Sequence, residues 1–563
     1  MRKIIRFFIS RQPAADFAIR TTLAAAAGMI CALLLEINHP WWAAMTVWLV
    51  VQPTRGLMLE KMIARFAGSL IGALAGTAIL LCLPMKSFEQ LLALALWLSI
   101  CIGVGSFFRQ FRNYGFVLAG YTAVIIVMFS YVESRADIAL AFDRTLCTLI
   151  GIVFASLTIF YRLSENSFAA MRLRFDNLVE AVLSQAHLNP RPPMRRLAGY
   201  VDDIVSLDAM LDREAAGSLM AMRETDRMKQ TLMALLDITV AISSAAPRDI
   251  IPSHPAGGSL TSEIHKRAFP YSDIPQTMLR RGLPDPTDKM GFLSWLRHHH
   301  WSAVLRAVLR PVGALLLSVS LWLLTCWHDG PVMVMTAVLF ASLFSSHPQG
   351  NAALTDVLVG TLAGTLSGGL FRLCIAPYLG HDLGLFIVIL PFLIIGAYLM
   401  ASPHTSKMAI DFNMTFLLVT QPFSSNLSPS IPDILTDCAA ILSGATLTAL
   451  WYWLVLPSSH HVGRVQATRR LIRIAGRLEN STSRKEKMWM LQIGKTTLVQ
   501  LFASHDRDER LIISGLRYLR YAQRSATQLH SHNNNSRKTS RRHSSMLAAR
   551  LIQRHLTCYR RII

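Results

Sequence analysis

Long apolar segments dominate this 563-residue chain, and a polar stretch divides them into two groups. A segment of roughly twenty apolar residues is long enough to cross a membrane as an α-helix. Each group also holds one shorter segment, which fits a half-length or tilted helix. The predicted segments are 17–37, 41–51 (short), 62–83, 91–108, 114–132 and 141–161 in the first group, and 303–327, 331–344 (short), 357–373, 383–400, 408–423 and 434–456 in the second.

A series of glycines follows each short segment and relates the two groups. Small residues that recur every four positions let two helix backbones pack closely inside a membrane. We therefore predict an all-α polytopic membrane protein with two related halves of about six helices each, an organisation typical of transporters. The glycines assigned to helix packing are Gly68, Gly72 and Gly76 in the first half and, starting 292 positions later, Gly360, Gly364 and Gly368 in the second.

Composition and charge agree with this class. The chain is 52% hydrophobic and 16% charged, with a mean hydropathy of +0.38, which excludes a single soluble globule. Much of the formal net charge of +22 lies after residue 456, where 22 Lys and Arg face 5 Asp and Glu. The positive-inside rule then predicts a cytoplasmic tail that suits anionic membrane lipid, rather than nucleic acid, as its partner. The N-terminus is also basic, so we expect both termini in the cytoplasm and a parallel repeat.

Two polar regions complete the predicted organisation. Between the halves, apolar periodicity predicts helices at about 168–182 and 197–246, followed by a loop rich in Pro and Gly. In the tail, helices are predicted at about 465–477 and 498–527, before a low-complexity segment expected to be disordered. The expected domains are a first membrane repeat (1–161), a cytoplasmic helical domain (162–302), a second membrane repeat (303–456) and a basic cytoplasmic tail (457–563), partly disordered.

No catalytic motif is present in the sequence, which has no GxSxG, HExxH or paired-carboxylate pattern, so we do not expect an enzyme. Gly494-Lys495 resembles the end of a phosphate-binding loop, but Trp489 stands where that loop requires glycine. His298–His300 are consecutive and would fan around a helix, and the eight cysteines are scattered singly. We therefore expect no cofactor and no metal.

The tryptophan-rich short span, the Gln52-Pro53 turn, the basic residues and the stepped glycines, repeated after a polar insert, resemble the fusaric acid resistance protein family. Within that family the chain is similar to the inner-membrane subunits of aromatic carboxylic acid efflux pumps. The resemblance covers about 17–456, is strongest over 40–76, and does not extend to the tail after about 480. It implies proton-motive-force-driven export of small aromatic acids across the bacterial inner membrane, with a periplasmic membrane fusion (adaptor) protein as partner. The sequence leaves a homo-oligomer open.

A site for an aromatic carboxylate needs apolar aromatic walls and a fixed cation. Arg65 is the first candidate, because it lies inside a span one turn before the glycine series. Some of the other candidates have a second interpretation: the tryptophans as interface anchors, and the remaining arginines as topology signals. The candidate substrate-binding residues are Arg65, Trp41, Trp42, Arg109, Arg112 and Tyr114.

Proton coupling requires a group inside a span that can change its charge. Asp143 and Asp437 lie at similar positions in the two halves, and Asp356 lies near the second-half counterpart of Arg65. These three are the candidate proton-coupling residues, and Asp411 is a further one. An ion pair with the adjacent Arg144 is the alternative role for Asp143. Two other functions stay open at this stage: a passive organic-anion channel, and a membrane scaffold or sensor that transports nothing.

Overall fold

The computed structural model describes residues 2–51, 55–108, 110–132, 138–160, 167–186, 193–214, 219–244, 301–345, 350–378, 382–402, 404–423, 430–455, 460–480, 484–503 and seven positions between 512 and 522. In these ranges the chain forms seventeen α-helices, one short 3-10 helix and no strand, which confirms the predicted all-α class. Eight of the helices are long and apolar enough to cross a membrane, and three shorter ones are apolar. The chain divides into two units, 1–163 with 300–459 and 164–299 with 460–563.

Twelve of the described α-helices lie in the first unit, and each corresponds to one predicted segment. Those of the first half are α1 (Arg2–Leu34), α2 (Trp41–Val50), α3 (Arg55–Cys82), α4 (Phe88–Gly105), α5 (Gln110–Val132) and α6 (Ile138–Phe160). Those of the second half are α13 (Trp301–Thr325), α14 (Gly330–Leu343), α15 (Gly350–Cys374), α16 (Asp382–Met400), α17 (Ser406–Thr420) and α18 (Ile431–Leu454), with the 3-10 helix η1 (Ala376–Tyr378) after α15.

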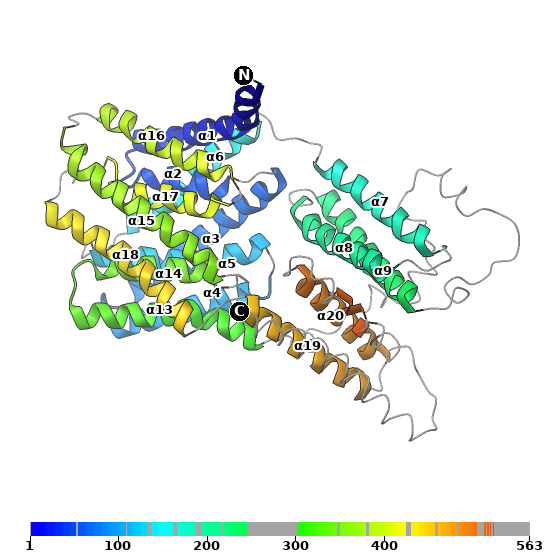
Figure 1. Ribbon diagram of the computed structural model, residues 1–563. Coiled ribbons are helices and arrows are strands. Elements are labelled where there is room, and N and C mark those ends of the chain that lie inside the picture. The colour runs from blue at the N-terminus through cyan, green and yellow to red at the C-terminus, as the bar shows by residue number, and fades with distance from the viewer. Residues whose placement is uncertain are drawn as a thin grey trace, which may run out of the picture. The chain divides into compact units, whose positions relative to one another are not determined.

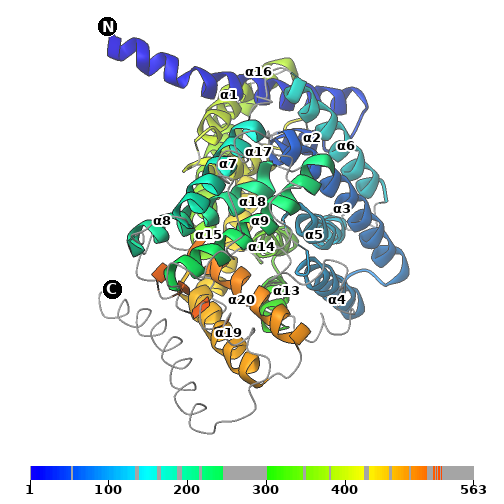
Figure 2. The ribbon, with the colours of Figure 1, turned by 90° about the vertical axis from the view of Figure 1, so that its right-hand side faces the viewer.

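The helices of the two halves pack in the same order. In each half the third helix packs on the fifth and sixth, and the second packs on the first and sixth. The fourth helix of each half packs on the fifth. Between the halves, α14 packs on α5 and α2 on α17, while α1 packs on α16 and α4 on α13. Figures 1 and 2 show α1 with α16 at one edge of this unit and α4 with α13 at the opposite edge. Parallel insertion of the two halves stays a prediction.

The two short helices lie in the interior of this unit. Almost every side chain of α2 and α14 is buried, including Trp41, Trp42 and Trp48. A helix of ten residues is only about 15 Å long, so α2 is shorter than the hydrocarbon layer. Because both helices are apolar on all sides, they are suited to burial among the longer spans rather than to a surface.

The glycine series brings helix backbones together in both halves. A Cβ atom added at Gly72 of α3 would lie 2.7 Å from the carbonyl oxygen of Ala119 on α5. One added at Gly364 of α15 would lie 2.7 Å from the carbonyl oxygen of Phe412 on α17. Real Cβ atoms essentially never come this close to another heavy atom. The α3–α5 and α15–α17 crossings therefore require glycine, which has no side chain, at these positions.

The second unit contains α7 (Ser167–Ala186), α8 (Met194–Glu214), α9 (Leu219–Ser244), α19 (His460–Asn480) and α20 (Arg484–Ala503). All five helices contribute to one apolar core, with Phe175, Leu236, Leu478 and Phe502 among its buried residues. The insert and the tail, which the sequence pattern treats as separate segments, therefore fold together. Instead of one long helix over 197–246 there are two, and α20 begins before the predicted residue 498.

Lys495 lies in the middle of α20, where it is buried and its Nζ donates to Asp237 Oδ2 of α9 at 2.5 Å. The lysine is thus an ion-pair partner inside a helix, in agreement with the rejection of a phosphate loop. The Pro- and Gly-rich loop, the histidine run, the low-complexity end of the tail and the turns at Gln52-Pro53 and His347-Pro348 lie outside the described residues.

Candidate functional site

Arg65 is completely buried in the first half, with 0% of its side chain exposed. It lies on α3 one turn before Gly68, where close packing directs it between α2 and α5. Its Nη1 donates to the hydroxyl oxygen of Tyr114 on α5 at 2.8 Å, and its Nη2 donates to Thr46 Oγ1 on α2 at 3.4 Å. Tyr121, about two turns further along α5, also interacts with the guanidinium.

Two more cations lie beside Arg65. Arg144 of α6 is buried, and its guanidinium carbon stands 4.8 Å from the ring centre of Trp42 on α2. Lys61, one turn before Arg65 on α3, places its Nζ 5.6 Å from the ring centre of Tyr114. Both interact unfavourably with the charge of Arg65. We call this set the basic aromatic cluster: Lys61, Arg65, Arg144, Trp42, Tyr114 and Tyr121.

The cluster has cations but no acid. Among the described residues, no hydrogen bond or ion pair joins Lys61, Arg65 or Arg144 to a carboxylate. The Nε atoms of Arg65 and Arg144 are buried and have no hydrogen-bond partner there. Buried charges are costly unless they are paired, so the cluster is electrostatically suited to a negatively charged guest. Its aromatic members have apolar ring faces, which are the kind of surface that binds a flat apolar ring.

The second half does not repeat the cluster. The residue 292 positions after Arg65 is Val357, which is buried. Gly151 of α6 packs against Ala43 of α2 as Gly444 of α18 packs against Met333 of α14, which fixes an offset of 293 between the sixth helices. At that offset the counterpart of Asp437 is Arg144, so the expected equivalence of Asp437 with Asp143 is wrong by one residue.

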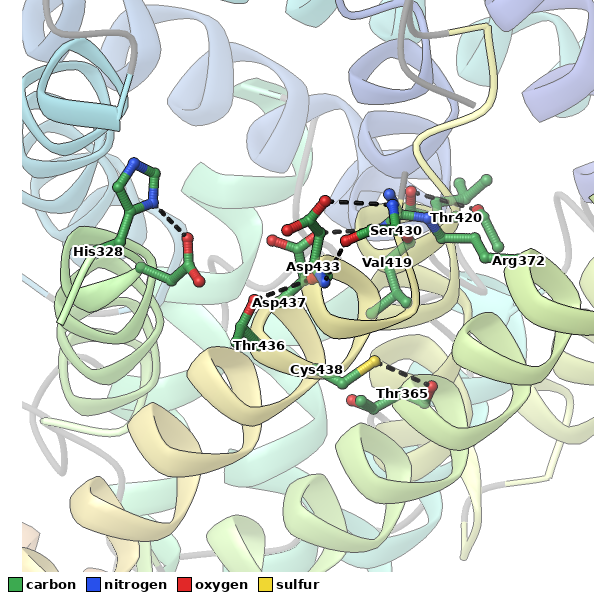
Figure 3. Close-up of polar contacts among 12 residues, drawn as sticks. His328, Thr365, Arg372, Val419, Thr420, Ser430, Asp433, Thr436, Asp437 and Cys438 are labelled. Carbon is green, nitrogen blue, oxygen red and sulfur yellow. Dashed lines mark hydrogen bonds and ion pairs between the residues drawn. The ribbon is translucent and has the colours of Figure 1, made fainter. Parts of the chain in front are cut away.

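Each predicted proton-coupling residue has a different environment. Asp143 is buried and accepts a hydrogen bond from Asn38 Nδ2 at 3.1 Å. Asp437 accepts from Arg372 Nη1 at 2.9 Å, and the same nitrogen donates to the carbonyl oxygen of Val419 at 3.1 Å (Figure 3). Asp356 is exposed on α15. Their role in coupling stays a prediction.

Of the predicted substrate-binding residues, the structure brings Arg65, Trp42 and Tyr114 together. Trp41 is buried next to Trp42 and contacts His39 edge-on, whereas the cations of the cluster lie over Trp42 and Tyr114. Arg109 lies outside the described residues, as does the side chain of Arg112 on α5. Lys61, Arg144 and Tyr121 are members of the cluster that the sequence pattern did not predict.

The position of the two unpredicted cations in or beside apolar segments is the signal that could have identified them. Arg144 lies inside a span, and Lys61 precedes Arg65 by one helical turn, which puts the two side chains on one face of α3. Metal binding has no such support: the described residues contain no group of three His, Cys, Asp or Glu side chains that could hold an ion.

Comparison with known proteins supports a membrane transporter. The model of the fusaric acid resistance protein family matches residues 14–253 and 286–560. The match includes most of the tail, so the expected departure after residue 480 is wrong. Uncharacterized transporter YdhK of Escherichia coli K12 is 26% identical over 255 residues, 44% of this chain and 38% of that protein.

Two further relatives match shorter segments. Uncharacterized transporter GOX0755 of Gluconobacter oxydans is 28% identical over 159 residues, 27% of this chain and 22% of that protein. The p-hydroxybenzoic acid efflux pump subunit AaeB of Musicola paradisiaca is 28% identical over 150 residues, 25% of this chain and 23% of that protein. The matched segments thus span less than two-fifths of each of these relatives. No solved structure matches the chain.

Proposed function

The chain belongs to the fusaric acid resistance protein family and has eight helices long and apolar enough to cross a membrane, and we propose that it is an inner-membrane transporter that exports small aromatic carboxylic acids. The observation that carries this proposal is the basic aromatic cluster, in which three cations lie beside Trp42 and Tyr114 without an acid among the described residues. A carboxylate would supply the missing negative charge. The ring of the same molecule would move from water to an apolar aromatic environment, which is favourable.

Hydrogen bonds from the arginines would contribute strongly to recognition of the carboxylate. A hydrogen bond to a charged group contributes about 1.5–3 kcal/mol net, and its loss weakens binding by roughly ten- to a hundredfold. The Nε of Arg65, which has no partner among the described residues, can donate a hydrogen bond to an anion while Nη1 keeps its hydrogen bond to Tyr114. Arg144 can do the same while its guanidinium stays on Trp42.

We further propose that the proton motive force drives export and that a periplasmic membrane fusion (adaptor) protein continues the route. One relative is named as a subunit of an efflux pump, which supports an assembly with other proteins. Net movement of an anion out of the cell against its gradient requires an energy source, and protons are available at this membrane.

Transport by the purified protein in liposomes tests the proposal. With p-hydroxybenzoate as the probe, we expect uptake that protein-free liposomes do not show. Arg65→Gln keeps a polar side chain but removes its charge, and we expect at least about a tenfold loss of uptake at low substrate concentration. Arg20→Gln is the matched control, because the Nε of this half-buried arginine of α1 donates to the carbonyl oxygen of Asp16 on its own helix.

Three outcomes separate the alternatives. Uptake that runs only downhill and ignores an imposed pH gradient would show a passive organic-anion channel. No uptake of any aromatic acid by the folded protein would contradict transport and favour a scaffold or sensor. Equal losses in Arg65→Gln and Arg20→Gln would remove Arg65 from the substrate site.

A further inference from the structure

Asp411 is a buried acid in the second half that the basic aromatic cluster does not use. It lies on α17 with 7% of the residue exposed, at the close crossing of α17 with α15. A Cβ atom added at Gly360 of α15 would lie 3.1 Å from the Cβ of Asp411. The absence of a side chain at Gly360 therefore gives the carboxyl group its place between the helices.

Thr361, the next residue of α15, is the hydrogen-bond partner of Asp411. The Oγ1 atom of Thr361 lies 2.5 Å from Asp411 Oδ2 and 3.0 Å from the carbonyl oxygen of Val357. A hydroxyl group has one proton, so it donates to only one of these two oxygens at a time. When the hydroxyl donates to Val357, a protonated Asp411 can donate to Thr361 Oγ1; when Asp411 is ionised, the hydroxyl can turn and donate to the carboxylate.

Both protonation states of Asp411 thus have a satisfied arrangement with the same heavy atoms. The difference between them is one rotation of the Thr361 hydroxyl. Asp411 Oδ1 has no hydrogen bond within the described part of the chain and is free to exchange the proton. A buried carboxyl group without a fixed ionic partner can change its charge at a lower cost than one held in a salt bridge.

Among the described side chains, no cation holds Asp411 in its ionised form. Helix α17 packs on α15, α16 and α2, and α2 has no titratable side chain. On α15, Asp356 is exposed and Arg372 pairs with Asp437. On α16, Tyr398 is half-buried, and Lys407, one turn earlier on α17, is exposed and in no ion pair within the described ranges. The hydrogen-bond partner that the structure gives the carboxyl is Thr361.

The three acids predicted for coupling are less suited to this task. Asp437 is held by Arg372, Asp143 by Asn38, and Asp356 is exposed. The first-half counterpart of Asp411 is Leu118, which meets Gly68 as Asp411 meets Gly360. The α3–α5 crossing therefore carries cations, and the equivalent α15–α17 crossing carries an acid.

We propose that Asp411 is the proton-carrying residue of this transporter, with Thr361 as its positioning residue. The inference rests on the proposed transport function. The O–H bond at Asp411 forms with a proton from the periplasm and breaks when the proton leaves to the cytoplasm, and the anion moves in the opposite direction. Protonation removes a negative charge from the packed α15–α17 crossing, while the ionised form requires the turned Thr361 hydroxyl.

Driven and undriven transport of p-hydroxybenzoate in liposomes separate this role from a structural one. With the vesicle interior one pH unit more acidic and the voltage clamped, one-for-one exchange accumulates the acid about tenfold in the wild-type protein. Passive distribution of a weak acid would give the opposite direction. We expect Asp411→Asn to abolish accumulation but to keep exchange of labelled for unlabelled substrate, and Asp411→Glu to restore part of the accumulation.

Asp16→Asn is the matched control and should accumulate the probe like the wild type, because Asp16 is an exposed acid on α1 and far along the chain from Asp411. Accumulation by Asp411→Asn at the wild-type level would overturn the inference and leave the proposed function intact. A wild-type protein that moves no probe would instead overturn the proposed function.

A second measurement does not depend on transport by the asparagine variant. Infrared difference spectra of the wild type between alkaline and acidic pH should show the carbonyl band of a protonated buried carboxylic acid. The band should shift in Asp411→Glu and persist unshifted in the control variant Asp16→Asn. A band unchanged in Asp411→Glu would overturn the inference even if Asp411→Asn failed to fold.

Discussion

Individual buried charges distinguish the two membrane halves more sharply than the helices do. Arg65 is enclosed by the partners Tyr114 and Thr46, neither of which is negatively charged. In the second half, Arg372 is buried next to Asp437. A paired charge is consistent with a structural role. Buried cations without an acid carry an uncompensated desolvation cost, which a bound anion would offset. Arg65 and Arg372 therefore have different expected functions, although both are buried arginines.

The Arg372–Asp437 pair should behave as a structural unit. We expect Arg372→Met to lower the free energy of unfolding by about 1–3 kcal/mol, because it leaves Asp437 partly buried without its donor. The double variant Arg372→Met with Asp437→Leu should lose less than the sum of the single losses. Thermal unfolding in detergent measures this, with Lys407→Met, at an exposed residue, as the control. Additive losses would show that the two side chains do not support each other.

Sequence alone predicts part of the candidate site and not the rest, for a geometric reason. Arg65 is identifiable because a charge inside an apolar span is rare. Adjacency in the chain suggests Arg144 as a partner of Asp143. Adjacent helical residues point about 100° apart, however, so Asp143 contacts Asn38 while Arg144 lies over Trp42. A one-residue error in register likewise matches Asp437 with the wrong residue.

At the scale of single helices, the glycine period and the length of the apolar segments predict most of what the structure shows. The glycine period of four predicts close crossings without naming the partner helix, which the structure identifies as α5 and α17. Apolar length predicts the twelve helices described in the first unit, including the short ones, because length and hydropathy are local properties. The partner of each helix depends on residues distant in the chain, so one sequence could not supply it.

Alanine substitutions should distinguish glycines at close helix crossings from a glycine with open space around it. We expect Gly72→Ala and Gly364→Ala each to destabilise the protein by about 1–3 kcal/mol, because the new methyl group would press on a carbonyl oxygen of the facing helix. Gly199→Ala in α8 has open space around it and should stabilise by roughly 0.5–1 kcal/mol. Unfolding midpoints provide the readout, and destabilisation of all three to the same degree would refute the close-crossing explanation.

At the scale of the whole molecule, the two membrane halves resemble each other in local backbone conformation as well as in helix order. Glu36, between α1 and α2, and Cys326, between α13 and α14, are 290 positions apart. Both have a positive φ, at 54° and 50°, which is uncommon for residues other than glycine. The chain thus makes the same unusual turn before each short helix. Composition could not foresee that the insert and the tail share one core, because their helices are separated by the entire second half.

Parallel insertion predicts that these two turns face the same side of the membrane. Cys326 is exposed and free, and Glu36→Cys introduces a thiol at the equivalent exposed position. In a protein whose other cysteines, including the exposed Cys82 and Cys374, are replaced by serine, one variant keeps Cys326 and a second carries Glu36→Cys with Cys326→Ser. A membrane-impermeant thiol reagent should label both variants from the periplasmic side. Labelling of one site only after the inner membrane is opened would show an inverted repeat.

Binding of an acid and of its neutral amide to the purified protein tests the central claim most directly. The basic aromatic cluster should bind p-hydroxybenzoate saturably and p-hydroxybenzamide at least about tenfold more weakly, because only the acid supplies the missing negative charge. Arg65→Gln should remove this preference, whereas Arg20→Gln should keep it. Equal affinity for acid and amide in the wild type, or an undiminished preference in Arg65→Gln, would contradict the account.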